Sequence, residues 1–93
     1  MALDFTSSPQ RIGETIYYAV DFSNYMDGNT VVSYSVSAKL IDTGESVQVL
    51  NPSLVDSKIV SMLVPINGVT AVYVDATTDV GEKLKATIFI PVA

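Results

Sequence analysis

Hydrophobic and polar residues alternate with a period of two along much of this chain, which is the spacing of half-buried β-strands. The first clear strand follows Gly13. Four large apolar residues share one of its faces, and we expect that face to point into the core: Ile16, Tyr18, Val20 and Phe22. The alternation predicts a sheet with one covered face.

The pattern breaks after this strand. Ser23 can cap a short helical turn through its hydroxyl, and such a turn would bring Met26 back to the core. Residues 27–30 (Asp-Gly-Asn-Thr) then predict a turn in which Gly28 takes a positive φ.

A second strand is predicted over Val31 to Leu40. Serines occupy alternate positions and indicate a solvent or partner face, so the other set is assigned to the core: Val32, Tyr34, Val36 and Ala38. A turn at residues 42–45 and a short strand from Ser46 to Leu50 follow.

Residues 51–53 (Asn-Pro-Ser) predict another turn. The segment from Ser57 to Val64 is apolar at nearly every position, which indicates a strand buried on both sides or an interface strand. Pro65 ends this strand, and Asn67 and Gly68 turn the chain.

The last two strands form a predicted hairpin around residues 78–82. The final strand places five apolar residues on the core face: Leu84, Ala86, Ile88, Ile90 and Val92. Six or seven short strands separated by turns favour an all-β fold, an immunoglobulin-like sandwich of about seven antiparallel strands. We assign this domain to residues 12–93 and an N-terminal arm to residues 1–11.

Leu3 and Phe5 of the arm alternate with Asp4. The arm therefore either adds a strand to a neighbouring sheet or frays, as chain termini often do.

The amino-acid composition argues against some classes of function and favours others. Apolar residues make up 48% of the 93-residue chain and charged residues only 16%, while the mean hydropathy is +0.38. A weakly charged, apolar-rich composition of this kind is typical of a subunit within a larger assembly. An aggregation-prone fragment has the same composition, so composition does not separate the two. The net charge of −5, with five basic residues, argues against nucleic acid and against an anionic membrane surface.

The chain contains no His and no Cys, so the usual general bases and nucleophilic triads are missing. We therefore expect no enzymatic activity, no cofactor and no metal. Two loops carry oxygen ligands that calcium prefers, Asp75, Asp79 and Glu82 in one, and residues 27 and 29 in the other. Their spacing fits no EF-hand loop, so we interpret them as ordinary turn and surface residues.

Several aromatic residues fall off the predicted core face. Buried centres of protein interfaces are rich in Tyr and Phe, so these residues indicate either cross-strand packing on the sheet surface or a binding surface. With the two apolar residues of the arm, the candidate partner-binding residues are Leu3, Phe5, Tyr17, Tyr25, Tyr73 and Phe89.

The segment from Ile16 to Val31, IYYAVDFSNYMDGNTV, resembles small immunoglobulin-like virion proteins of tailed bacteriophages known as fiber-tail adaptor proteins. Those proteins pair a Tyr-x-Ile/Val-Asp-Trp-Ser strand with a short turn and a Gly-Asp before the next strand, and they end in a Thr-rich hairpin like residues 77–84. The resemblance covers Pro9 to the C-terminus, with Phe22 in place of Trp and Asn29 in place of Asp.

The resemblance implies a structural virion protein without enzymatic activity that joins the tail body to the fibers. Its implied partners are other phage structural proteins, the tail tube or nozzle and the fiber, in several copies around a symmetric tail assembled in the host cytoplasm. Two alternatives remain open: a capsid decoration or head-completion protein, and a cell-surface or carbohydrate-binding immunoglobulin-like module.

Overall fold

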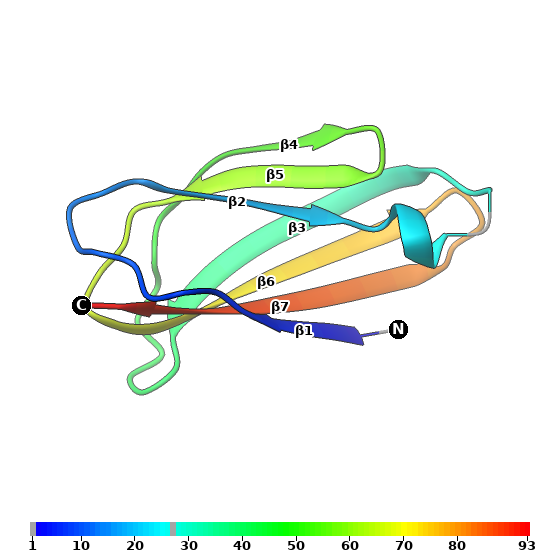
Figure 1. Ribbon diagram of the computed structural model, residues 1–93. Coiled ribbons are helices and arrows are strands. Elements are labelled where there is room, and N and C mark those ends of the chain that lie inside the picture. The colour runs from blue at the N-terminus through cyan, green and yellow to red at the C-terminus, as the bar shows by residue number, and fades with distance from the viewer. Residues whose placement is uncertain (1, 27) are drawn as a thin grey trace.

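The computed structural model describes residues 2–26 and 28–93, and it is a sandwich of two β-sheets (Figure 1). Within these residues the chain forms seven strands and one short 3-10 helix: β1 (Ala2–Thr6), β2 (Ile16–Asp21), η1 (Ser23–Tyr25), β3 (Val31–Leu40), β4 (Val49–Val55), β5 (Lys58–Leu63), β6 (Gly68–Thr78) and β7 (Lys83–Val92). The predicted all-β sandwich is confirmed.

One sheet has the strand order β1-β7-β6-β3 and the other the order β2-β5-β4. All pairs are antiparallel except one, because β1 runs parallel to β7 from Ala2 opposite Lys85 to Thr6 opposite Phe89. The predicted arm therefore contains a strand of the chain's own main sheet. Hydrogen bonds beyond β1 also hold this segment, since the amides of Ser7 and Gln10 donate to carbonyls of Phe89 and Pro91.

The core lies between the two sheets and contains the apolar faces that the alternation predicts in β2 and β7. Ile16 and Val20 of β2 are buried, and so is Phe22 directly after it. In β7, all five predicted core residues are buried. Burial of such side chains stabilises the fold by about 1.5–3 kcal/mol each.

The beginning of β3 differs from the prediction. Val31 is buried with 7% of its surface exposed, whereas Val32, which we assigned to the core, is 61% exposed. The register against β6 shifts between Val31 and Ser33. Such a β-bulge adds one residue to one strand and reverses the faces on either side of it, so the assignment is wrong at this end and holds at Ala38.

The predicted turn at residues 51–53 is also wrong, because β4 continues through it to Val55. The register against β5 is irregular between Leu50 and Ser53, and Asn51 takes a φ of 48° there. Asn is among the few residues that tolerate this left-handed conformation. The turn to β5 comes later, at Asp56 (φ 57°) and Ser57.

The apolar segment before Pro65 forms β5, the middle strand of the three-stranded sheet. Ile59, Ser61 and Leu63 point into the core and are buried, while Val60 and Met62 alternate with them and are half-buried. Within the chain, β5 is thus covered on one side only. Its other side is an outer face of the sandwich.

Candidate functional site

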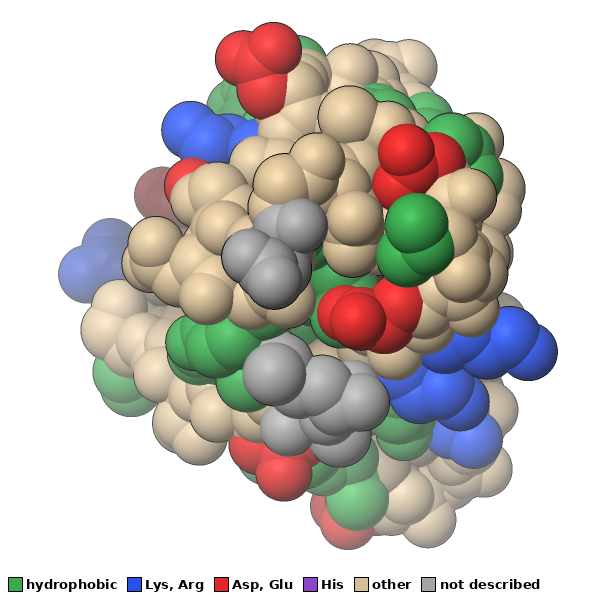
Figure 2. Space-filling view, turned by 90° about the vertical axis from the view of Figure 1, so that its right-hand side faces the viewer, with side chains coloured by type: hydrophobic (Ala, Val, Ile, Leu, Met, Phe, Trp, Pro, Cys, Tyr) green, Lys and Arg blue, Asp and Glu red, His purple; other side chains and the backbone are tan. Residues whose placement is uncertain are grey.

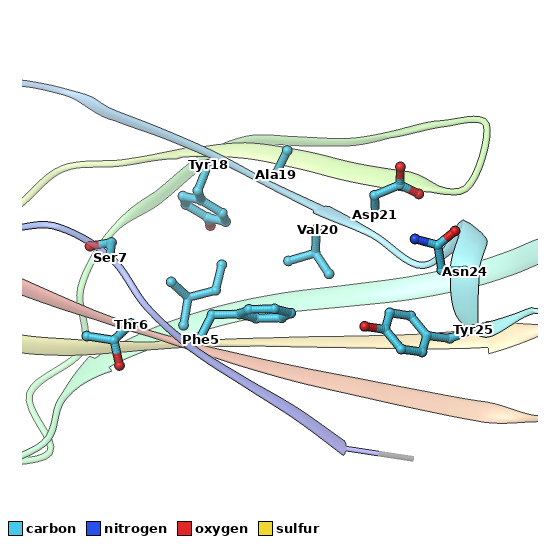
Figure 3. Close-up of a pocket in the computed structure, with 10 residues that line it drawn as sticks. Phe5, Thr6, Ser7, Tyr18, Ala19, Val20, Asp21, Asn24 and Tyr25 are labelled. Atoms are coloured by element: carbon cyan, nitrogen blue, oxygen red, sulfur yellow. The ribbon is translucent and has the colours of Figure 1, made fainter.

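The two long sides of the sandwich differ. On one side, the Tyr34 hydroxyl of β3 donates to the Pro52 carbonyl of β4 at 3.2 Å, and an isolated β-bridge links Lys39 to Ser46 in the segment that leads to β4. On the other side, β1 and β2 are the edge strands and do not pair with each other. Between them lies a groove with a volume of about 480 Å³ (Figure 3).

We call this space the edge groove. Phe5 from β1 and Tyr25 from η1 reach into it, and they are 44% and 37% exposed (Figure 3). The remaining lining residues come mostly from β2 and its flanks: Thr6, Ser7, Tyr18, Ala19, Val20, Asp21, Asn24 and Ile88. The described lining contains one charged side chain, the Asp21 carboxylate.

Asp21 also fixes the helical turn that carries Tyr25. Its Oδ1 accepts a hydrogen bond from the Ser23 amide at 2.9 Å, and the Tyr25 amide donates to the Phe22 carbonyl at 2.9 Å. The predicted cap through the Ser23 hydroxyl is wrong, because no side-chain cap of η1 forms and the carboxylate before it accepts the amide instead. Met26 packs against the core, as expected.

The bonds to Ser23 hold the pKa of Asp21 below its usual value, with smaller contributions from Ser57 and Lys58. Hydrogen bonds and positive charge both favour the ionised form. The carboxylate is therefore a fixed negative charge at one end of the edge groove.

Tyr18 lies beside the groove but is directed inward from β2 (Figure 3). Burial raises the pKa of its hydroxyl, and nearby Ser61 offsets part of that rise. The buried hydroxyl nevertheless has no hydrogen-bond partner of good geometry, since Ser61 Oγ donates to the Leu50 carbonyl at 2.8 Å. An unsatisfied buried polar group costs about 1–3 kcal/mol.

The outer face of the three-stranded sheet adjoins the groove through β2. Cross-strand register places Tyr17 opposite Met62, which in turn lies opposite Leu50, and it places Ala19 opposite Val60. We call these five residues the outer patch. Tyr17 is 79% exposed, and no member of the patch is charged. A surface with few charges therefore continues from the outer patch over the edge of β2 into the edge groove, where Asp21 is the one charged residue of the described lining.

The outer face of the four-stranded sheet has a different character. Tyr73 and Phe89 lie on it and are half-buried, among charged residues that include Lys85. The ammonium nitrogen of Lys39 stands 5.6 Å from the centre of the Tyr73 ring. A cation over an aromatic face is a stabilising contact, and here it covers the ring from outside.

Acidic side chains are dispersed at the end of the sandwich that carries η1 and the β6–β7 turn. Figure 2 shows them separated by uncharged residues. Asp79 bonds to the backbone, because its Oδ1 accepts a hydrogen bond from the Thr30 amide at 3.3 Å. Among residues 2–26 and 28–93, no three acidic side chains gather where they could hold a metal ion. Asp27, considered above with Asn29, lies outside the described residues.

The structure thus divides the six candidate residues. It brings Phe5 and Tyr25 together in the edge groove, while Leu3 packs against the core. Tyr17 lies on the outer patch, opposite Met62, and does not line the groove. Tyr73 and Phe89 occupy the opposite outer face and belong to no common site with the others.

Sequence reasoning missed Asp21 and Leu50. Asp21 matches the Asp of the motif that the resemblance quotes, but nothing in the sequence placed it at a groove or against η1. Leu50 was placed in a strand, but its position beside Met62 depends on the irregular register of β4.

Comparison with protein-family models finds no match for this chain, and comparison with curated protein sequences finds none either. In the described part of the chain, no helix is long and apolar enough to cross a membrane.

Proposed function

We propose that this chain is a structural subunit of a tailed-bacteriophage virion that joins the tail body to the fibers, present in several copies and without enzymatic activity. The observation that carries the proposal is the weakly charged surface formed by the outer patch and the edge groove, in which Asp21 is the one charged residue among those described. A subunit needs such a surface to dock, because charged residues are depleted at the centres of protein interfaces. The segment from Ile16 to Val31, which resembles tail adaptors, supplies β2 and Tyr25 to this surface.

The size of the outer patch indicates how much further a docked partner must extend. The outer patch spans three strands of about six residues, or roughly 20 Å by 14 Å. A stable interface needs about 800 Å² from each partner. The outer patch alone is too small, so the partner must also cover the β2 edge and the edge groove.

The chemistry of the opposite outer face does not favour the alternative of a carbohydrate-binding module. A sugar would need an open aromatic ring to stack on, and Lys39 stands over Tyr73. Phe89 is half-buried between Ala71 and Thr6 of the neighbouring strands. The exposed aromatic residues lie on the weakly charged surface around β2 instead.

The test is complex formation with candidate tail tube and fiber proteins of tailed bacteriophages, measured by size-exclusion chromatography with light scattering. We expect co-elution with a tail protein, lost in Tyr17→Asp and retained in Val80→Asp. Val80 is 67% exposed in the turn between β6 and β7, so it is a matched control away from β2. Binding to capsid proteins instead, or a complex that Tyr17→Asp leaves intact, would refute the proposal.

A further inference from the structure

The four edge strands of the sandwich are not equally protected against pairing with another chain. An unprotected edge presents free backbone N–H and C=O groups to any extended segment, and proteins block it with bulges, prolines or covering contacts. We call the side formed by β3 and β4 the closed side. There, β3 has the bulge after Val31, and β4 has the Asn51 irregularity and Pro52. One hydrogen bond, from the Tyr34 hydroxyl to the Pro52 carbonyl, also links these two strands.

The open side, formed by β1 and β2, has none of these features within the described residues. The register of β2 against β5 is regular over all six residues, and the register of β1 against β7 is regular from Ala2 to Thr6. Neither strand contains a proline or a lysine. The protection on one side and its absence on the other indicate that the open side is kept free for a strand.

We infer that the free edge of β2 accepts an extended segment of a partner protein as an added antiparallel strand, and that the edge groove receives one of its apolar side chains. Strand addition of this kind obtains affinity from main-chain hydrogen bonds and specificity from pockets for alternate side chains. Phe5 and Tyr25 supply the walls of that pocket (Figure 3). The inference rests on the proposed function, for which it names the chemistry of the partner.

Charge complementarity defines one end of the segment. On the paired side of β2, the strand β5 places Lys58 opposite Asp21. On the free side the Asp21 carboxylate is fully exposed at the end of the groove, and the described groove lining supplies no cation. A partner segment that runs like β5 therefore carries a Lys or Arg near its N-terminal end and apolar residues at alternate positions after it.

The chain itself provides a probe with this pattern. A fluorescein-labelled peptide of residues 57–64, the β5 segment, is titrated with the intact protein and followed by fluorescence anisotropy. We expect saturable binding, and a scrambled peptide of the same composition should not bind. Phe5→Asp should weaken binding at least tenfold, because it places a charge in the pocket, while Val80→Asp should change nothing.

A charge exchange tests the predicted register. Asp21→Lys should weaken binding of the peptide about three- to fivefold, the range of an exposed ion pair. A peptide with Lys58→Glu should show the reverse preference and bind the variant better than the wild type. Circular dichroism melts confirm that each variant is folded before its affinity is interpreted.

Three outcomes would overturn the inference: no binding of the peptide, equal binding of the scrambled peptide, or no reversal in the charge exchange. A dimer of this chain in sedimentation that Phe5→Asp abolishes, without peptide binding, would assign the edge to a second copy and overturn it as well. If tail proteins still bind Phe5→Asp but not Tyr17→Asp, this inference fails while the proposed function stands.

Discussion

The bulge at the start of β3 makes two neighbouring valines unequal, and their substitution by alanine tests that assignment. Strict alternation with Tyr34 and Ala38 would bury Val32 and expose Val31. The structure has the reverse, with 7% of Val31 and 61% of Val32 exposed. The two changes are chemically identical and occur in the same strand, so their difference reports burial alone.

The expected difference follows from the groups that are removed. Val31→Ala deletes two buried methyl groups, worth about 0.8 kcal/mol each in transfer free energy. The cavity left behind raises the total to roughly 2–3 kcal/mol. Val32→Ala loses only strand propensity, which costs at most about 1 kcal/mol. The free energies of unfolding of the two variants should therefore differ by about 1–3 kcal/mol.

Urea unfolding followed by far-UV circular dichroism measures this difference. The slope for a small domain is about 1–3 kcal/mol/M, so the midpoint of Val31→Ala should lie about 1 M below that of Val32→Ala. Equal midpoints, or a lower midpoint for Val32→Ala, would refute the bulge and restore strict alternation. A changed slope in either variant would mean that the unfolded state was altered as well.

Three further predictions concern the region around the edge groove. Phe22→Ala should lower the free energy of unfolding by about 3–5 kcal/mol, because Phe22 is fully buried. Tyr17→Ala should lower it little, because Tyr17 is exposed. Similar losses in urea unfolding of the two variants would contradict the core assignment. Asp21→Asn should be less stable than the wild type at pH 7, and the two should converge as the pH falls below 3.8, since a lowered pKa stabilises only where the carboxylate is ionised; a gap that persists at about pH 2 would count against this. Tyr18→Phe should be at least as stable as the wild type at pH 7, because it removes an unsatisfied hydroxyl. Above about pH 10 the wild type should become less stable relative to Tyr18→Phe. Its raised pKa means that the folded state keeps the phenol proton more tightly than the unfolded state, so ionisation favours unfolding. A Tyr18→Phe variant that is markedly less stable at pH 7 would show that the hydroxyl has a partner.

The sequence by itself determined the faces of the regular strands. Ile16 and Val20 of β2 and the five core residues of β7 are buried where alternation placed them, because successive side chains of a strand point to opposite sides whatever the strand pairs with. The absence of His and Cys is likewise a property of the sequence alone.

Tertiary structure decided how the strands pair and which edges stay free. The bulge that buries Val31 exists only in the pairing with β6, and the partner of β1 is the last strand, more than 80 residues away along the chain. The edge groove joins Phe5 to Tyr25 because two sheets close over one core and leave one side open. Local periodicity contains no information about such long-range pairing, since one pattern of alternation serves equally well in a central strand and in an edge strand.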